Sequence, residues 1–320
     1  MDTRQPTPSQ HNAAPSVEHG SGALADLQHL RNQSGPRNTI GLSDAVVIDF
    51  LGRDPKLGQA ISEAVAARDA LPPAHRALLT QPEAEVVDAL QAGFLNFYAD
   101  DAINPYVPLA ARGAWVVTAH GAVLHDSGGY GMLGFGHGPQ DLLDAMAKPE
   151  VMANVMTASF AQAEFDRRLR AEVGHTRGGC PFDKLVCLNS GSESVTLAAR
   201  ISDINAKTQV GPGGAHEGRR PVFVAMEGGF HGRTDRPAQV SHSTRKAYRG
   251  NLASFQNRNN LLAVPPNNIE ALHAAFAEAD AKGLFVEAVF IEPVMGEGRP
   301  GHPLERAFYD AARALSQAHG

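Results

Sequence analysis

The spacing of apolar positions in the first part of the chain predicts helices and one β-hairpin. Apolar residues recur there every three or four positions, which is the period of a helix that buries one face. Two short apolar runs about a glycine predict a hairpin, and proline favours the first turn of a helix. The expected elements are helices over residues 57–70 and 83–98, a β-hairpin over residues 114–126, and a helix from Pro139 to about Lys148.

From residue 184 onward, apolar runs of strand length alternate with segments of helical period. The expected strands cover residues 184–188, 221–225 and 286–291, and the expected helices cover residues 192–207, 268–281 and 304–319. Strands and helices that alternate in this way form parallel sheets covered by helices. We therefore predict an α/β fold with a parallel-rich sheet flanked by helices. The polar segments 208–220 and 235–265 are expected to be loops or excursions.

The beginning of the chain has a different composition. Residues 1–37 are rich in Gln, Ser, Pro, Asn and Gly, and segments of this kind bury too little apolar surface to fold. We expect a disordered leader over residues 1–37, a helical segment with the β-hairpin over residues 38–130, and a sheet-containing large domain over residues 131–320.

Composition and charge argue against several classes of partner. The 320 residues carry a net charge of −6, with 43% hydrophobic and 19% charged residues, so neither nucleic acid nor an anionic membrane is expected as the main partner. No apolar run approaches the roughly 20 residues that a bilayer span needs, and a cytoplasmic location is expected by default. Cys180 and Cys187 are too few for a disulfide framework, and Cys187 is interpreted as a buried strand residue.

Each of the three expected strands ends in a turn that is rich in glycine and polar residues. These turns are NSGSE at residues 189–193, GGFHGRT at residues 228–234 and EPVMGEG at residues 292–298. In open α/β sheets, ligands bind outside the carboxyl ends of the strands. The three turns are therefore the candidate site.

The first turn has the features of a phosphate site. Ser190, Gly191 and Ser192 join a strand to a helix, and the free N–H groups and dipole at a helix start favour an anion. Gly191 lets a ligand approach the backbone closely. The alternative is an ordinary helix cap, because Ser followed by Glu is a common helix start. The P-loop pattern is absent.

The other two turns carry aromatic, basic and acidic side chains. Phe230 can lie flat on a planar cofactor, Arg233 offers a planar fork for a carboxylate, and His231 can carry a proton. Glu292 and Glu297 can orient a group at a ring nitrogen or pair with an arginine. The alternatives are a packed Phe, a polar His and solvated charges. The scattered histidines form no HExxH or CxxC pattern, so no metal is expected, and the absence of GxSxG argues against a serine hydrolase.

The order of the three turns, about forty and then about sixty residues apart, resembles that of the class III, pyridoxal-phosphate-dependent aminotransferases. The hairpin and the GYGMLGFGHGP segment look like the N-terminal region of that family, and the resemblance covers roughly residues 105–320. Because Arg233 directly follows the stacking segment, the lysine- and ornithine-type members are most similar. The resemblance implies the large domain of the fold type I transferases and the cofactor pyridoxal 5'-phosphate.

The resemblance also implies roles for individual residues. Ser190, Gly191 and Ser192 would hold the cofactor phosphate. Phe230 would stack on the pyridine ring with His231 beside it, and Glu292 would help to position the aspartate that pairs with the ring nitrogen. Substrate binding would fall to three further residues, of which Tyr130 lines the pocket, Arg233 binds the α-carboxylate and Glu297 holds a second arginine.

The family's Schiff-base lysine, its Asp-Glu pair and its C-terminal domain have no counterpart in the 320 residues. The PLP-binding large domain over residues 131–320 is therefore expected to be partial and incomplete at the C-terminus. The expected activity is transfer of an amino group from an amino acid, or from the ω-amine of a diamino acid, to a 2-oxo acid. The full-length form would be a homodimer and this chain would be inactive alone. The alternatives are a non-catalytic pseudoenzyme or dimerisation fragment, or a class III decarboxylase or aminomutase.

Overall fold

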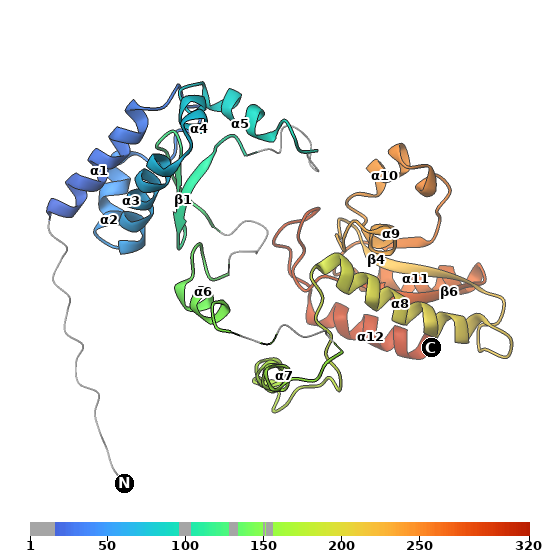
Figure 1. Ribbon diagram of the computed structural model, residues 1–320. Coiled ribbons are helices and arrows are strands. Elements are labelled where there is room, and N and C mark those ends of the chain that lie inside the picture. The colour runs from blue at the N-terminus through green and yellow to red at the C-terminus, as the bar shows by residue number, and fades with distance from the viewer. Residues whose placement is uncertain (1–16, 96–103, 128–133, 150, 152–155) are drawn as a thin grey trace, which may run out of the picture. The chain divides into compact units, whose positions relative to one another are not determined.

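The computed structural model describes residues 17–95, 104–127, 134–149, 151 and 156–320, with side chains described from residue 22 onward. It divides into two units, Met1–Asn154 and Val155–Gly320 (Figure 1). The sequence instead placed boundaries at residues 37 and 130. The difference arises because the backbone of His137 pairs with that of Gly113, which ties the segment after residue 133 to the first unit.

The first unit packs helices against a three-stranded antiparallel sheet with the strand order β1-β2-β3. β2 and β3 are the predicted hairpin, with Gly121 at a φ of 72° in its turn. The predicted helices are present as α3, α5 and α6. Helix α5 ends at Gln91, whereas the predicted helix covered residues 83–98. The elements are α1 (Val17–Asn32), α2 (Asp44–Leu51), α3 (Pro55–Ala70), α4 (Pro73–Leu78), α5 (Glu83–Gln91), β1 (Pro108–Arg112), β2 (Trp115–Thr118), β3 (Val123–His125) and α6 (Gln140–Met146).

Helix α1 occupies part of the segment that was expected to be disordered, so that expectation is wrong for residues 17–32. Ala23, Leu27 and Leu30 lie at helical spacing and are buried against a core that includes Ile61 and Trp115. A few well-spaced apolar residues are enough to bury one face of a helix. The polar composition of the segment concealed this spacing.

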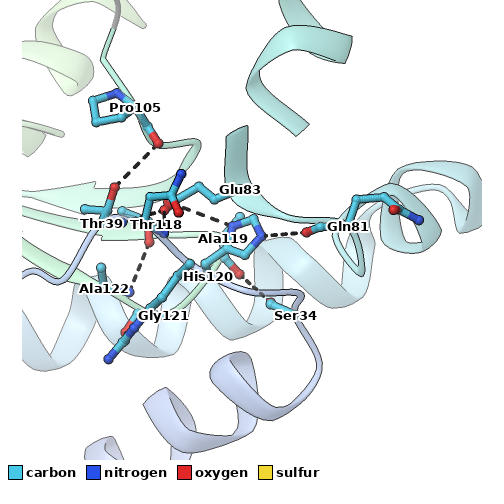
Figure 2. A network of polar contacts seen from close by, with 12 residues as sticks. Ser34, Thr39, Gln81, Glu83, Pro105, Thr118, Ala119, His120, Gly121 and Ala122 are labelled. Atoms are coloured by element: carbon cyan, nitrogen blue, oxygen red, sulfur yellow. Dashed lines mark hydrogen bonds and ion pairs between the residues drawn. The ribbon is translucent and has the colours of Figure 1, made fainter. Parts of the chain in front are cut away.

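A buried carboxylate joins α5 to the rest of the first unit. Glu83 is fully buried, and its Oε2 accepts hydrogen bonds from the backbone amides of Asn38 (2.8 Å) and Thr39 (2.7 Å). Figure 2 shows His120 beside it, with Nε2 3.3 Å from the carbonyl oxygen of Gln81 and Nδ1 3.9 Å from Glu83 Oε1. Because one buried carboxylate oxygen accepts from two successive amides, Glu83 fixes the loop at residues 38–39 onto the helix.

The second unit contains a parallel sheet with the strand order β5-β4-β6. Alternate residues of β4 point to opposite faces, and α11 and α12 cover the face that includes Val224, while α9 covers the face that includes Phe223. The predicted α/β fold with a parallel sheet flanked by helices is confirmed. The elements are α7 (Phe160–Gly174), α8 (Gly191–Val210), β4 (Arg220–Met226), α9 (Asp235–Val240), α10 (Arg245–Asn251), a 3-10 turn (Ala253–Phe255), β5 (Leu261–Val264), α11 (Ile269–Ala281), β6 (Leu284–Phe290) and α12 (Arg306–His319).

Two predictions about strands were wrong. Residues 184–188 form no strand, and Cys187 is exposed rather than buried. An apolar run becomes a strand only where another strand pairs with its backbone, and no strand among the described residues pairs with this one. Conversely, the segment 235–265 contains the short strand β5, which pairs with β4 through Phe223 and Leu261.

Candidate active site

The first turn forms an open helix start. Ser190 has an extended backbone and caps α8, with its Oγ accepting a hydrogen bond from the amide of Glu193 (3.2 Å). Gly191 faces open space, because no atom lies within 4 Å of the place where a Cβ would be. The capping role and the exposed first turn are therefore both present. An anion can reach the N–H groups at this helix end.

The second turn lies directly against the first turn of α8. Ser192 Oγ accepts a hydrogen bond from the amide of Arg233 (3.2 Å), and the hydroxyls of Thr196 and Thr234 are 3.1 Å apart. Gly232 has a φ of +118°, and a Cβ at this position would lie 2.5 Å from Ser192 Oγ. Only glycine fits such a close approach with that backbone conformation.

The third turn is joined to the second by Glu292. Its Oε1 accepts a hydrogen bond from the amide of Phe230 (2.7 Å), and its Oε2 accepts one from the amide of Gly296 (2.9 Å). The backbones of Gly228 and Gly298 also meet, because a Cβ on Gly298 would collide with the carbonyl oxygen of Gly228. The structure thus brings all three turns together in the second unit.

Arg233, Phe230 and Glu297 form one cluster. The guanidinium of Arg233 lies over the ring of Phe230, 5.7 Å from its centroid, and Arg233 Nη2 is 3.7 Å from Glu297 Oε2. Both charged side chains are partly exposed. A cation over an aromatic face is favourable, whereas a partly exposed ion pair contributes little. The ring and the carboxylate therefore both contact the guanidinium.

His231 is buried beside Glu292. Its amide donates to Ser241 Oγ (2.9 Å), its ring meets Phe290 edge-on, and its Nε2 is buried with no hydrogen-bond partner. Burial lowers the pKa of His231, and the charge of Glu292 opposes this effect. The structure therefore favours a neutral imidazole here.

The sequence did not single out two supporting residues of the site. Ser241 Oγ accepts from the amide of His231 and donates to the carbonyl oxygen of Gly232 (2.9 Å), and His242 Nδ1 accepts from the amide of Gly228 (2.9 Å). Both residues lie in the polar segment 235–265, where neither apolar periodicity nor a known motif marks them. Side chains that support a turn carry no recognisable signal of their own.

Some predicted features lie outside the site as described. Tyr130 falls outside the described residues. The three turns themselves contain no lysine. Among the described residues, His, Cys, Asp and Glu form no group of three that could hold a metal ion. No helix of the described chain is both long and apolar enough to cross a membrane.

The family model for the class III aminotransferases matches residues 97–320. This match covers more than half of the chain, so the chain belongs to the class III aminotransferase family. The acetylornithine aminotransferase of Mycolicibacterium smegmatis is 32% identical over 133 residues, which are 41% of this chain and 28% of that protein. The first helical segment, α1 to α5, lies before the matched region.

Two solved structures show the same fold. The ornithine aminotransferase from Toxoplasma gondii has a TM-score of 0.57 at 20% identity, over 73% of this chain and 51% of that chain. The acetylornithine aminotransferase from Elizabethkingia anophelis has a TM-score of 0.51 at 19% identity, over 74% of this chain and 53% of that chain. The chain thus spans about half the length of these enzymes.

Proposed function

We propose that the three turns of the second unit hold pyridoxal 5'-phosphate in an enzyme that transfers an amino group from an amino acid to a 2-oxo acid. The observation that carries the proposal is the hydrogen bond between Ser192 Oγ and the amide of Arg233. It places an open helix start beside an aromatic ring and a guanidinium. The helix start suits a phosphate, the aromatic ring suits a pyridine ring, and the guanidinium suits a substrate carboxylate.

The cofactor would be held at two points. The first turn of α8, with Ser190, Gly191 and Ser192, would receive the phosphate through N–H groups and hydroxyls. The ring of Phe230 would pack against the pyridine face, and Glu292 would hold Phe230 in place through its amide. When bound, the cofactor supplies an electron sink for the bonds at the α-carbon of the amino acid. His231, with its lowered pKa, would stay neutral beside it.

Arg233 would bind the substrate carboxylate. Its guanidinium is positioned over Phe230 and is only 3.7 Å from Glu297. An incoming carboxylate would compete with Glu297 for the same cation, and a bidentate pair is stronger than the loose pair present now. The relatives named as acetylornithine and ornithine aminotransferases support a substrate that carries an α-carboxylate and an amine at the far end of its side chain.

The proposed role of this chain is to hold the cofactor without covalent attachment. The described site contains no lysine, and a lysine is the usual covalent anchor and proton carrier for this cofactor. We therefore expect the 320-residue chain alone to bind the cofactor reversibly and to show no transaminase activity. The full-length enzyme is proposed to act as a homodimer.

Cofactor binding by the full 320-residue chain tests the proposal. We expect saturable binding of pyridoxal 5'-phosphate in equilibrium dialysis, with competition by inorganic phosphate. Ser192→Ala should weaken binding about tenfold, because it removes one hydroxyl and loosens Arg233. Ser316→Ala, on α12, is the matched control and should bind as the wild type does. The proposal would be refuted if the chain does not bind pyridoxal 5'-phosphate, or if inorganic phosphate does not compete with that binding.

A non-catalytic role in partner binding is the second candidate, and exposed apolar side chains favour it. Ile201 and Ile204 on α8 are 62% and 66% exposed, and Val186 is 67% exposed. Exposed apolar side chains that gather on a surface often mark an interface. Sedimentation velocity over a range of concentrations tests this candidate for self-association, and a monomer at every concentration would exclude self-association of the chain alone.

A further inference from the structure

Glu287 is a buried carboxylate in β6 that belongs to none of the three turns. Its side chain is only 3% exposed, and its Oε1 accepts hydrogen bonds from Arg236 Nη2 (2.5 Å) and Ser202 Oγ (2.7 Å). These partners lie on α9 and α8. One carboxylate oxygen therefore joins the sheet to both helices.

The strand register explains how a charged side chain comes to lie there. Val222 of β4 pairs with Val286, and Phe223 pairs with Ala288, so Glu287 is an extra residue in β6. Such bulges redirect a side chain and are frequent beside active sites. The contacts with Ser202 and Arg236 show that Glu287 is directed to the helices α8 and α9.

Arg236 holds α8 through several contacts at once. In addition to Glu287, it donates to the carbonyl oxygen of Ala199 (3.1 Å) and pairs with Asp203 (3.4 Å). Its guanidinium also lies over the ring of Phe223, 5.4 Å from the centroid. Arg236 is in the first turn of α9, three residues after Arg233. The segment that carries the candidate site is therefore fastened to α8 a second time.

The two fastening points lie far apart along α8. The first point is Ser192, in the first turn of α8, which accepts from the amide of Arg233. The second point includes Ser202, which donates to Glu287. Ten residues of helix separate them, or about 15 Å along the axis. The hydroxyls of Thr196 and Thr234 meet between these two points. Contacts spread over this length of α8 resist sliding and turning relative to the loop better than contacts at its first turn alone.

The chemistry of the pair favours a geometric role over a contribution to overall stability. Burial raises the pKa of Glu287, while the hydrogen bond from Ser202 and the charge of Arg236 oppose the rise. A buried ion pair loses hydration and often gives no more stability than an apolar pair of similar volume. What an apolar pair lacks is direction, because it does not specify which atoms meet.

We propose that Glu287 and Arg236 are positioning residues that set the distance between the phosphate-binding start of α8 and the loop of Phe230 and Arg233. The hydrogen bonds and ion pairs of both side chains run to α8 and to each other, so the pair acts through α8 and α9. The expected effect of the pair on cofactor binding rests on the proposed function. Its effect on the rigidity of the loop does not, because that rigidity is measured without any ligand.

Hydrogen–deuterium exchange of the full 320-residue chain tests the pair without any ligand. The double variant R236M/E287M removes both charges, so no buried charge is left alone, and E287Q keeps the bond to Ser202. We expect amides in the segment 228–234 and in the first turn of α8 to exchange about tenfold faster in the double variant, with a smaller effect in E287Q. The melting temperature and the exchange of β5 should not change.

The matched control is Arg219→Met, which removes the ion pair with Asp280 (2.6 Å) elsewhere in the same unit. It should leave exchange in the segment 228–234 as in the wild type. Unchanged exchange in this segment in the double variant would overturn the inference. If the double variant fails to fold, E287Q decides, because it retains the shape of the side chain and should still speed exchange only in these two segments.

Binding of pyridoxal 5'-phosphate separates this inference from the proposed function. If the wild type binds, the double variant should bind about tenfold more weakly, and equal affinity would overturn the inference. If the wild type does not bind, the proposed function fails, while the exchange comparison still decides whether the pair holds the loop.

Discussion

Phe230 and Glu292, which are 62 residues apart in the chain, are joined by a 2.7 Å hydrogen bond from the backbone amide to the carboxylate. The same carboxylate accepts from the amide of Gly296 at 2.9 Å. Glu292 therefore bridges two turns instead of facing open space. This bridge fixes the backbone that carries the aromatic ring proposed to cover the cofactor.

Replacement of Glu292 by alanine should loosen both turns. The amides of Phe230 and Gly296 would lose their charged acceptor, and each loss costs about 1–2 kcal/mol where water replaces it poorly. We expect the free energy of unfolding in urea to fall by roughly 2 kcal/mol. Glu297→Ala is the control, since its partner Arg233 is 3.7 Å away and partly exposed. Equal losses in the two variants would contradict the bridging role.

Gly232 should tolerate no side chain. Its φ of +118° is unfavourable for any other residue, and a Cβ would lie 2.5 Å from Ser192 Oγ. We expect Gly232→Ala to destabilise the second unit by about 2–3 kcal/mol and to abolish saturable binding of pyridoxal 5'-phosphate. Differential scanning calorimetry and dialysis measure the two effects.

The control for Gly232 is Gly250, a helical glycine of α10 with nothing within 4 Å of its Cβ position. Gly250→Ala should be neutral or stabilise by up to about 1 kcal/mol, because alanine favours a helix more than glycine does. A Gly232→Ala variant that melts and binds like Gly250→Ala would show that the close approach to Ser192 is unimportant.

The sequence was sufficient to predict β4, β6 and the turns that follow them. β4 and β6 are apolar runs of ordinary length, and glycine-rich turns stand out from their surroundings, so local pattern was enough. It was not enough for residues 184–188, because pairing of a strand depends on distant residues. Helix α1 was missed because a few apolar residues among many polar ones determine its buried face.

The supporting contacts of the site were beyond the reach of sequence patterns. Arg236 and Glu287 are 51 residues apart, and each is a common surface residue when considered alone. The extra residue in β6 that directs Glu287 toward α8 is visible only when the register with β4 is known. Convergence of distant side chains is a property of the folded chain, not of any local segment.

Among the carboxylates of the first unit, Glu83 should contribute most to the stability of that unit. Replacement by alanine would leave the amides of Asn38 and Thr39 without their carboxylate acceptor. We expect a loss of about 3 kcal/mol and a lower melting temperature for this unit, measured by circular dichroism. Glu85→Ala, at an exposed position on the same helix, is the control and should change stability by less than about 0.5 kcal/mol. Equal effects would exclude the role of Glu83 as an anchor.

Stability of the second unit should fall in mild acid, and the sign follows from His231. Its pKa is lowered by burial in the folded chain, so between that lowered value and its ordinary value of about 6.5 the unfolded chain binds more protons. Protons then favour unfolding. The free energy of unfolding is therefore highest above about pH 6.5, where His231 is neutral in both states. It falls as the pH drops from there to the lowered pKa of the folded chain. Burial also lowers the pKa values of His242 and His319, which act in the same direction.

Urea unfolding at pH 7.5 and 5.5 measures this dependence. His231→Phe replaces the ring by one that cannot take up a proton, so the difference in unfolding free energy between the two pH values should shrink. His273→Gln, at an exposed position on α11, is the control and should retain the wild-type difference. A His231→Phe variant that loses as much stability in acid as the wild type would show that the acid sensitivity comes from other groups. That result would remove the argument for a neutral imidazole beside Glu292.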